Sequence, residues 1–228
     1  MAKQTLISQG RRRLRSLIVV LVVLVIGLVV WLVGFSSALA LQRVEVRGAE
    51  LVTASDVITA ANLEIGRPMI QIRSLDVGSR ILAAIPEVAT VDVSRQWPKT
   101  VVLQITERQI VFQVVVHRGY GWVSSDGVVF HSTTKPADAL IAAVSPNDGP
   151  LLRDVASVIV ALPEWLGQQV QTISAATKDS ITLKLSDKRQ VIWGSAEETE
   201  LKIQVIEQLL TIPGHYYDIS APTNPAVR

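Results

Sequence analysis

The sequence predicts an α+β protein in which a single transmembrane helix precedes a β-α-α-β-β domain and a mixed β-rich domain with flanking helices. Three observations lead to this prediction. Residues 16–42 carry no charged side chain. Residues 44–107 contain two helical and three alternating apolar patterns. Residues 108–228 contain short apolar runs separated by turn signals, which are typical of strands.

The uncharged stretch is long enough to cross a bilayer as a helix over residues 17–37. Crossing the hydrocarbon core takes about 20 apolar residues, and residues 17–33 are almost entirely Leu, Val and Ile. Every charged residue of the preceding segment, 1–16, is basic, which predicts a cytoplasmic N-terminus and an outward-facing C-terminus. A cleaved signal peptide is the alternative, because residues 38–40 read Ala-Leu-Ala. Its apolar region would be only about 7–15 residues long, which favours the uncleaved helix.

Composition narrows the classes of function. Of the 22 basic and 20 acidic residues, five basic ones and no acidic one precede the uncharged stretch. The remainder of the chain is therefore slightly acidic and gives no reason to expect a nucleic acid partner. The chain has no cysteine, which excludes disulfides, cysteine metal sites and thiol catalysis.

A small α+β domain is predicted directly after the uncharged stretch. Thr53 and Asp56 resemble an acidic capping box, which marks the start of a helix. The alternating strands have one buried face, and the two helices are expected to cover it. Trp97 lies in the turn with Pro98 that joins the last two strands, and we expect its side chain to cover one end of the core. The predicted elements are a strand over 44–46, helices over 57–61 and 75–85, and strands over 88–95 and 101–107.

A larger β-rich domain is predicted over the rest of the chain. The Asp-Gly pair at 126–127 marks a hairpin, and Ser195 with Glu198 forms a capping box for the last helix. Pro222 and Pro225 are expected to exclude regular pairing beyond the last strand. The predicted elements are strands over 110–116, 122–123, 128–130, 140–144, 170–176, 180–185, 190–193 and 216–220, a turn over 119–121, and helices over 151–162 and 201–209.

No motif in the sequence indicates catalysis. His117, His131 and His215 are scattered, and none shares a local motif with an acidic residue or a second histidine. Residues 124–127 lack the Gly-x-Ser-x-Gly pattern of a nucleophile elbow, and a hairpin turn explains them. A glycine-rich phosphate loop is absent from the sequence. We therefore predict no catalytic residue, no cofactor and no metal site.

The last predicted strand is the strongest candidate for a binding surface. Tyr216–Ser220 is short, polar at alternate positions and followed by prolines, as edge strands are. Edge strands accept a partner strand through main-chain hydrogen bonds. The alternative is that this segment only closes the sheet, with Tyr216 or Tyr217 packed inward.

Four groups of residues, in chain order, form a specific combination. They are Val44-x-Val46-x-Gly48; Val91-x-Val93-x-Arg95-Gln96-Trp97-Pro98 with Glu107-Arg108; Val191-Ile192-Trp193-Gly194 before a helix that contains Lys202; and Tyr217-Asp218-Ile219-Ser220-Ala221-Pro222 with Pro225-Ala226-Val227-Arg228. Together they resemble the FtsQ/DivIB family of bacterial division proteins over nearly the whole chain. The resemblance implies a basic cytoplasmic tail over 1–16, a transmembrane helix over 17–37, a POTRA domain over 41–109, a β domain over 110–222 and a C-terminal tail over 223–228.

The resemblance also implies a function. The chain would be a non-enzymatic divisome scaffold that recruits and links division proteins at the septum and influences septal peptidoglycan synthesis. It would lie in the bacterial cell membrane and bind FtsB/DivIC-like and FtsL-like bitopic proteins and other divisome components. An anchored extracytoplasmic enzyme acting on cell wall or peptides is the alternative from another class. The residues expected to bind the partner are Tyr216, Tyr217, Asp218, Ile219, Ser220, Val227 and Arg228.

Overall fold

The structure, a computed structural model, describes residues 17–28, 31 and 39–228. The predicted basic tail, the rest of the predicted membrane span and the first residue of the Ala-Leu-Ala site lie outside these ranges.

The predicted fold class is wrong in its first part. Within the described ranges, no helix is both long enough and apolar enough to cross a membrane. Residues 17–28 are helical and their aliphatic side chains are exposed. The remainder of the predicted class, a β-α-α-β-β domain followed by a mixed β-rich domain, is confirmed.

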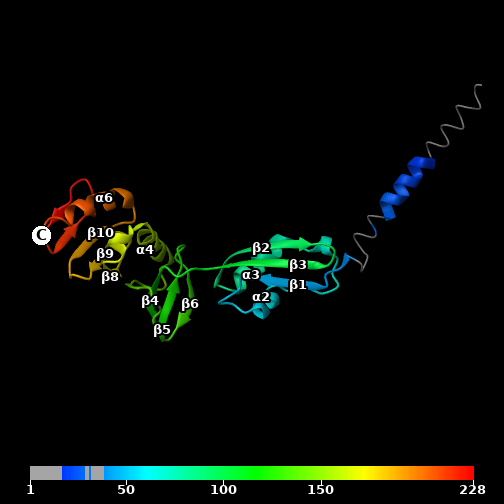
Figure 1. Ribbon diagram of the computed structural model, residues 1–228, viewed down its shortest axis with the longest axis horizontal. Coiled ribbons are helices and arrows are strands. Elements are labelled where there is room, and N and C mark those ends of the chain that lie inside the picture. Colours follow the sequence, from blue (N-terminus) through cyan, green and yellow to red (C-terminus); the bar gives the residue numbers. More distant parts are fainter. Residues whose placement is uncertain (1–16, 29–30, 32–38) are drawn as a thin grey trace, which may run out of the picture. The chain divides into compact units, whose positions relative to one another are not determined.

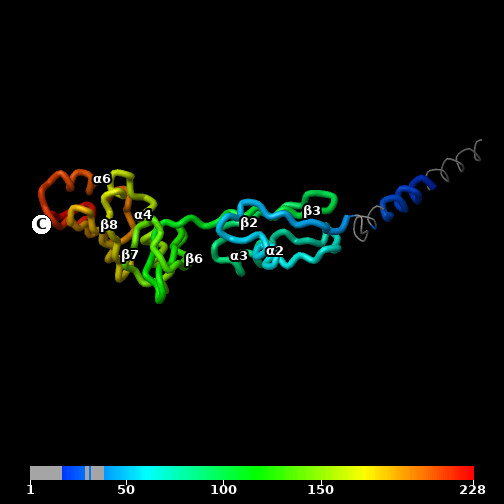
Figure 2. The backbone as a smooth tube through the Cα atoms, turned by 60° about the horizontal axis from the view of Figure 1, so that its bottom comes forward, coloured from blue at the N-terminus to red at the C-terminus, as the bar shows by residue number. Residues whose placement is uncertain are grey.

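The chain divides into two compact units between Glu107 and Arg108. In the first unit two helices cover one face of a three-stranded sheet (Figures 1 and 2). Its elements are β1 (Arg43–Arg47), α2 (Ala54–Ala61), the 3-10 helix η2 (Met69–Gln71), α3 (Ser74–Ala84), β2 (Val88–Gln96) and β3 (Thr100–Glu107). β3 lies in the centre, parallel to β1 and antiparallel to β2.

Local signals in the sequence place the helices of the first unit correctly. The hydroxyl of Thr53 accepts the N–H of Asp56 at 3.2 Å, so Thr53 caps α2 as predicted. Helix α3 ends before Pro86, also as predicted. The two helices contribute buried side chains to one core with all three strands. The buried helical residues are Val57 and Ala61 of α2 and Val77, Gly78 and Ile81 of α3.

Glu107, at the end of β3, holds the turn that leads into α2. Its carboxylate accepts the backbone N–H groups of Glu50, Leu51 and Val52, each at 2.9 Å. Burial raises the pKa of the Glu107 carboxyl, but the three N–H donors more than offset this and hold the pKa below its usual value. The ionised form of Glu107 therefore stabilises the first unit.

Trp97 does not cover the core, contrary to the sequence-based expectation. The Trp97-Pro98 peptide bond is cis and lies between β2 and β3, but the Trp97 side chain is 49 % exposed. The N–H of Gln42 donates to the carbonyl of Lys99 at 2.9 Å. Leu41, one residue earlier, is fully buried in the core of the first unit, to which Trp97 does not contribute.

The second unit is a nine-stranded mixed sheet with helices on one face (Figure 1). Its elements are β4 (Phe112–Val116), β5 (Gly119–Val123), β6 (Val129–Thr133), β7 (Leu140–Ala143), α4 (Gly149–Ala161), α5 (Glu164–Gly167), β8 (Val170–Ser174), β9 (Ile181–Leu185), β10 (Gln190–Gly194), α6 (Thr199–Leu209), β11 (Tyr216–Asp218) and β12 (Ala226–Val227). The strand order is β12-β11-β10-β9-β8-β7-β4-β5-β6. α4 and α6 contact each other and share one core with the strands.

Two local predictions in the second unit are wrong. Strand β5 already begins at Gly119, so the turn precedes residues 119–121. Helix α6 begins at Thr199 after Glu198, which has a left-handed backbone with φ of 53° and no side-chain cap. The predicted capping box of Ser195 and Glu198 therefore does not form, because the N-cap position is Glu198 itself and Ser195 lies three residues before it.

Replacement of Trp97 by alanine is expected to leave the stability of the first unit nearly unchanged. A half-exposed side chain away from the core contributes within about 1 kcal/mol. The matched control is Leu103→Ala in the adjoining strand β3, where the side chain is fully buried and its loss costs about 2–5 kcal/mol. Thermal denaturation of both variants measures the difference. A large drop in melting temperature for Trp97→Ala would contradict its exposed position.

Replacement of Glu107 by glutamine is expected to remove part of the acid sensitivity of the first unit. The folded-state pKa of Glu107 is lowered, so its stabilising contribution is present above the unfolded pKa and is lost as the pH falls through the folded pKa. The variant should melt earlier than wild type at about pH 7, and the difference should shrink at about pH 3. Glu64→Gln, which removes an exposed carboxylate of the same unit, is the control and should change neither value appreciably.

Candidate functional site at the C-terminal edge

β12, not the preceding strand, forms the C-terminal edge of the nine-stranded sheet. β11 pairs in parallel with β10 on one side and antiparallel with β12 on the other. The expectation that Tyr216–Ser220 is the edge strand is therefore wrong. The expectation that prolines exclude pairing after this strand is also wrong, because Pro222 and Pro225 both precede the paired residues and leave their N–H groups intact.

The edge presents unpaired main-chain groups at Val227. Tyr216 and Arg228 exchange two hydrogen bonds, each of 2.9 Å, between their backbone N–H and carbonyl groups. Successive residues of an antiparallel strand direct these groups to opposite sides. The N–H and carbonyl of Val227 therefore point away from β11, toward the open side of the sheet, where a further strand would lie.

The predicted site residues divide between two faces, because side chains alternate along a strand. Tyr216 is 51 % exposed, whereas Tyr217 and Ile219 are 1 % and 0 % exposed and belong to the core. Asp218 is half-buried and accepts both the N–H and the hydroxyl of Ser220, at 3.0 and 2.7 Å, which turns the chain away from the sheet. The remaining predicted residues lie at the edge itself: Val227, which is half-buried, and Arg228, which is exposed.

A cavity of about 580 Å³ opens on the face of the sheet that carries Tyr216. Tyr216, Asp218 and Arg228 line it, together with residues that the sequence did not single out. These are Ile192 of β10, Ala226 of β12 and His215. The parallel pairing of β10 with β11 brings Ile192 opposite Asp218, a contact that no local pattern in the sequence predicts. The cavity lies directly beside the open edge, so main-chain and side-chain contacts are available together.

Tyr217 anchors the edge to the rest of the unit. Its hydroxyl lies 2.8 Å from the carbonyl of Ile212 and 3.1 Å from that of Gly214, and it donates to this pair. The guanidinium of Arg189 lies over its ring, 5.9 Å from the ring centre. Of the two tyrosines that were considered for an inward position, Tyr217 is therefore the one that packs inward.

Two contacts fix the chain directly after β10, and one of them also places the segment after β11. Gly194 has φ of 78°, and a Cβ atom at this residue would lie 2.7 Å from the Cβ of Ser220, so only glycine allows the close approach. The ammonium of Lys202 in α6 is buried and donates to the carbonyl of Ser195 at 2.8 Å. Burial lowers the pKa of Lys202, although nearby carboxylates oppose this.

The residues that could have suggested a nucleophile have structural partners. The hydroxyl of Ser124 donates to the carboxylate of Asp126, which also pairs with Arg108. Burial raises the pKa of Asp126, but the hydrogen bonds from Ser124 and Arg108 outweigh this and lower it. The hydroxyl of Ser124 therefore has an ionised carboxylate as its partner and packs inside the hairpin between β5 and β6.

The open edge and its cavity suit the binding of another chain. In the part of the chain that the structure describes, no three His, Asp or Glu side chains gather closely enough to hold a metal ion. The arrangement at the C-terminal edge can instead extend the sheet by one strand and accept side chains in the adjoining cavity.

Comparison with known proteins gives two family matches. Residues 39–108 match the model of the POTRA domain, FtsQ-type. Residues 113–218 match the model of the cell division protein FtsQ/DivIB, C-terminal. The matches therefore cover both units of the structure, and the second includes all of β11.

Individual proteins align over almost the whole chain. The cell division protein FtsQ of Streptomyces collinus is 34 % identical over 95 % of this chain and 89 % of its own length. That of Streptomyces coelicolor is 31 % identical over 94 % and 88 %, and that of Mycobacterium tuberculosis 34 % identical over 95 % and 70 %. Among solved structures, the major extracytoplasmic domain of DivIB from Geobacillus stearothermophilus aligns with 52 % of this chain and 98 % of its own at 14 % identity and a TM-score of 0.36.

The family matches, the identity of about a third with the Streptomyces proteins and the order of the two units agree with one another. The resemblance seen in the four groups of residues is confirmed. The chain belongs to the FtsQ/DivIB family of bacterial cell division proteins.

Proposed function

We propose that the chain is a non-enzymatic scaffold of the divisome, which recruits and links division proteins at the septum and thereby influences septal peptidoglycan synthesis. One observation carries the proposal. The backbone of Val227 faces outward at a sheet edge, directly beside the cavity that Tyr216 lines. This combination suits the addition of a strand from another protein, because main-chain bonds supply affinity and the cavity supplies specificity.

The partners proposed for this edge are FtsB/DivIC-like and FtsL-like bitopic proteins. Their contact residues would be the members of the predicted set that are not buried, Tyr216, Asp218, Ser220, Val227 and Arg228. Tyr217 and Ile219 would contribute by holding the edge in place, since both are buried. An aromatic side chain near the centre of an interface commonly carries much of the binding energy, which makes Tyr216 the main expected contact.

We propose that both units work on the outer side of the bacterial cell membrane, at the division septum. The concentration of basic residues in the segment 1–16 supports this orientation. The proposed domain limits are 41–109 for the POTRA domain and 110–222 for the β domain, with a C-terminal tail over 223–228. Within that tail, residues 226–227 contribute the edge strand β12.

Replacement of Val227 by proline is expected to abolish capture of the FtsB/DivIC-like partner while the protein stays folded. Among the main-chain groups, proline removes the outward N–H of Val227, which has no partner within the sheet. Co-purification with the partner measures binding, and circular dichroism measures folding. Arg228→Pro is the matched control, because it removes an N–H that bonds to Tyr216 and should loosen β12 itself. If a folded Val227→Pro protein captured as much partner as the wild-type protein does, this edge would be excluded as the docking strand.

Replacement of the two adjacent tyrosines by alanine is expected to have opposite consequences. Tyr216→Ala should leave the melting temperature unchanged and cost about 2 kcal/mol or more of binding free energy. Tyr217→Ala should destabilise the second unit by about 3–5 kcal/mol, because its ring and hydroxyl are buried. Thermal denaturation and titration with the purified partner separate the two effects. Unaltered partner affinity in Tyr216→Ala would place the contact elsewhere on the surface.

A further inference from the structure

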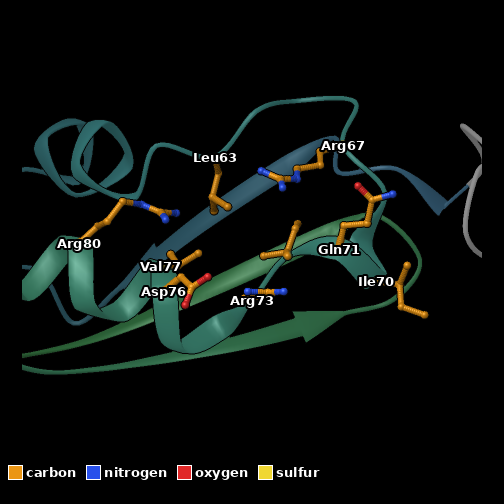
Figure 3. A pocket seen from close by; sticks show the side chains of 9 residues that line it. Leu63, Arg67, Ile70, Gln71, Arg73, Asp76, Val77 and Arg80 are labelled. Atoms are coloured by element: carbon orange, nitrogen blue, oxygen red, sulfur yellow. The ribbon is translucent and has the colours of Figure 1, made fainter.

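A second cavity, of about 530 Å³, lies in the first unit, far along the chain from the C-terminal edge. It is formed by the segment between α2 and η2 and by the first turns of α3 (Figure 3). Three arginines line it, Arg67, Arg73 and Arg80, against a single carboxylate, Asp76. The lining therefore carries an excess of positive charge.

The three arginines are available to a ligand to different degrees. The guanidinium of Arg80 donates from Nε and Nη2 to the carbonyl of Ala61, at 3.1 and 2.7 Å, which holds it at one side of the cavity. Arg67 and Arg73 are exposed, and their guanidinium groups have no hydrogen-bond or ion-pair partner among the described residues. Figure 3 shows Arg67 and Arg80 extending toward each other on either side of Leu63.

The backbone that carries these arginines is fixed before any ligand arrives. The carbonyl of Arg67 accepts the N–H of Leu41 at 2.9 Å, and Leu41 is fully buried. The carbonyl of Arg73 accepts the N–H of Val77 at 3.2 Å, in the first turn of α3. Binding would therefore order side chains only, which lowers its entropic cost.

Aliphatic side chains lie among the arginines. Ile70 is 51 % exposed and lines the cavity together with the half-buried Leu63. A ligand that fills the cavity must therefore supply anionic groups and apolar groups at close spacing. Carboxylates suit the arginines, because the planar guanidinium binds a carboxylate through two parallel hydrogen bonds.

We propose that this cavity binds an acidic protein segment in which Asp or Glu alternates with aliphatic residues. The cavity is concave and combines both chemistries within one small volume, which fits a peptide segment better than a flat lipid surface. The inference rests on the proposed scaffold function for the kind of partner, a protein. It adds a second docking site whose residues are separate from those of the C-terminal edge.

The test uses the full-length chain purified in a non-ionic detergent. The probes are short, end-blocked, fluorescent peptides in which Glu or Asp alternates with Leu or Val, each paired with its Gln or Asn counterpart. The variant is Arg67→Gln with Arg73→Gln. The control is Arg43→Gln with Arg95→Gln, which removes the same charge from exposed positions on β1 and β2 of the same unit. Fluorescence anisotropy measures binding, and circular dichroism confirms that all three proteins are folded.

An acidic peptide should bind the wild type and the control alike, bind the Arg67/Arg73 variant at least about tenfold more weakly, and lose binding when its carboxylates become amides. If the peptide bound all three proteins equally, binding would depend on the overall charge of the protein and not on Arg67 and Arg73, which would overturn the inference. The inference would also be overturned if no acidic peptide bound. Binding of phosphatidylglycerol vesicles through the same arginines, without peptide binding, would overturn it as well. Capture of the FtsB/DivIC-like partner through Val227 is a separate readout, so either proposal can fail alone.

Discussion

The arrangement of the C-terminal part of the molecule depends on hydrogen-bond partners for the backbone N–H and carbonyl groups on both sides of β11. A strand buried through Tyr217 and Ile219 cannot leave a row of N–H and carbonyl groups unpaired beside it. β10 satisfies one side and β12 the other. Because the two-residue β12 completes this pairing, the open edge moves outward by one strand, and the exposed face of Tyr216 becomes the wall of a cavity instead of the rim of the sheet.

The two units offer two different kinds of recognition. At the C-terminal edge, the groups that point outward belong to the main chain of Val227, and every protein strand carries the complementary groups. In the first unit, the groups that point outward are the guanidinium groups of Arg67 and Arg73, which select for charge. For the proposed scaffold function such a difference would favour specificity, because a partner suited to one surface would have little affinity for the other.

Local patterns predicted the first unit almost completely. Thr53 caps α2 through a bond to its near neighbour Asp56, and Pro86 cannot continue α3 because it lacks an N–H. Alternation in 101–107 follows from one buried sheet face. The errors have non-local causes. Leu41 belongs to the core and Trp97 does not, and the segment that carries Leu41 reaches the turn from far away in the sequence. Of the predicted contact residues, alternation alone separates exposed Tyr216 from buried Tyr217, but only the order of the strands identifies β12 as the edge and adds Ile192 to the cavity.

A sheet edge that is open to a partner strand is also open to copies of itself, and the short length of β12 limits that risk. Long, flat edges pair with one another and lead to aggregation. β12 has two residues, and the preceding Pro225 cannot donate to a neighbouring strand. Two such edges from different molecules could form very few main-chain bonds, too few to offset the entropy lost on association. Under the proposed function, a partner segment that also filled the cavity beside Tyr216 would gain further contacts beyond these main-chain bonds.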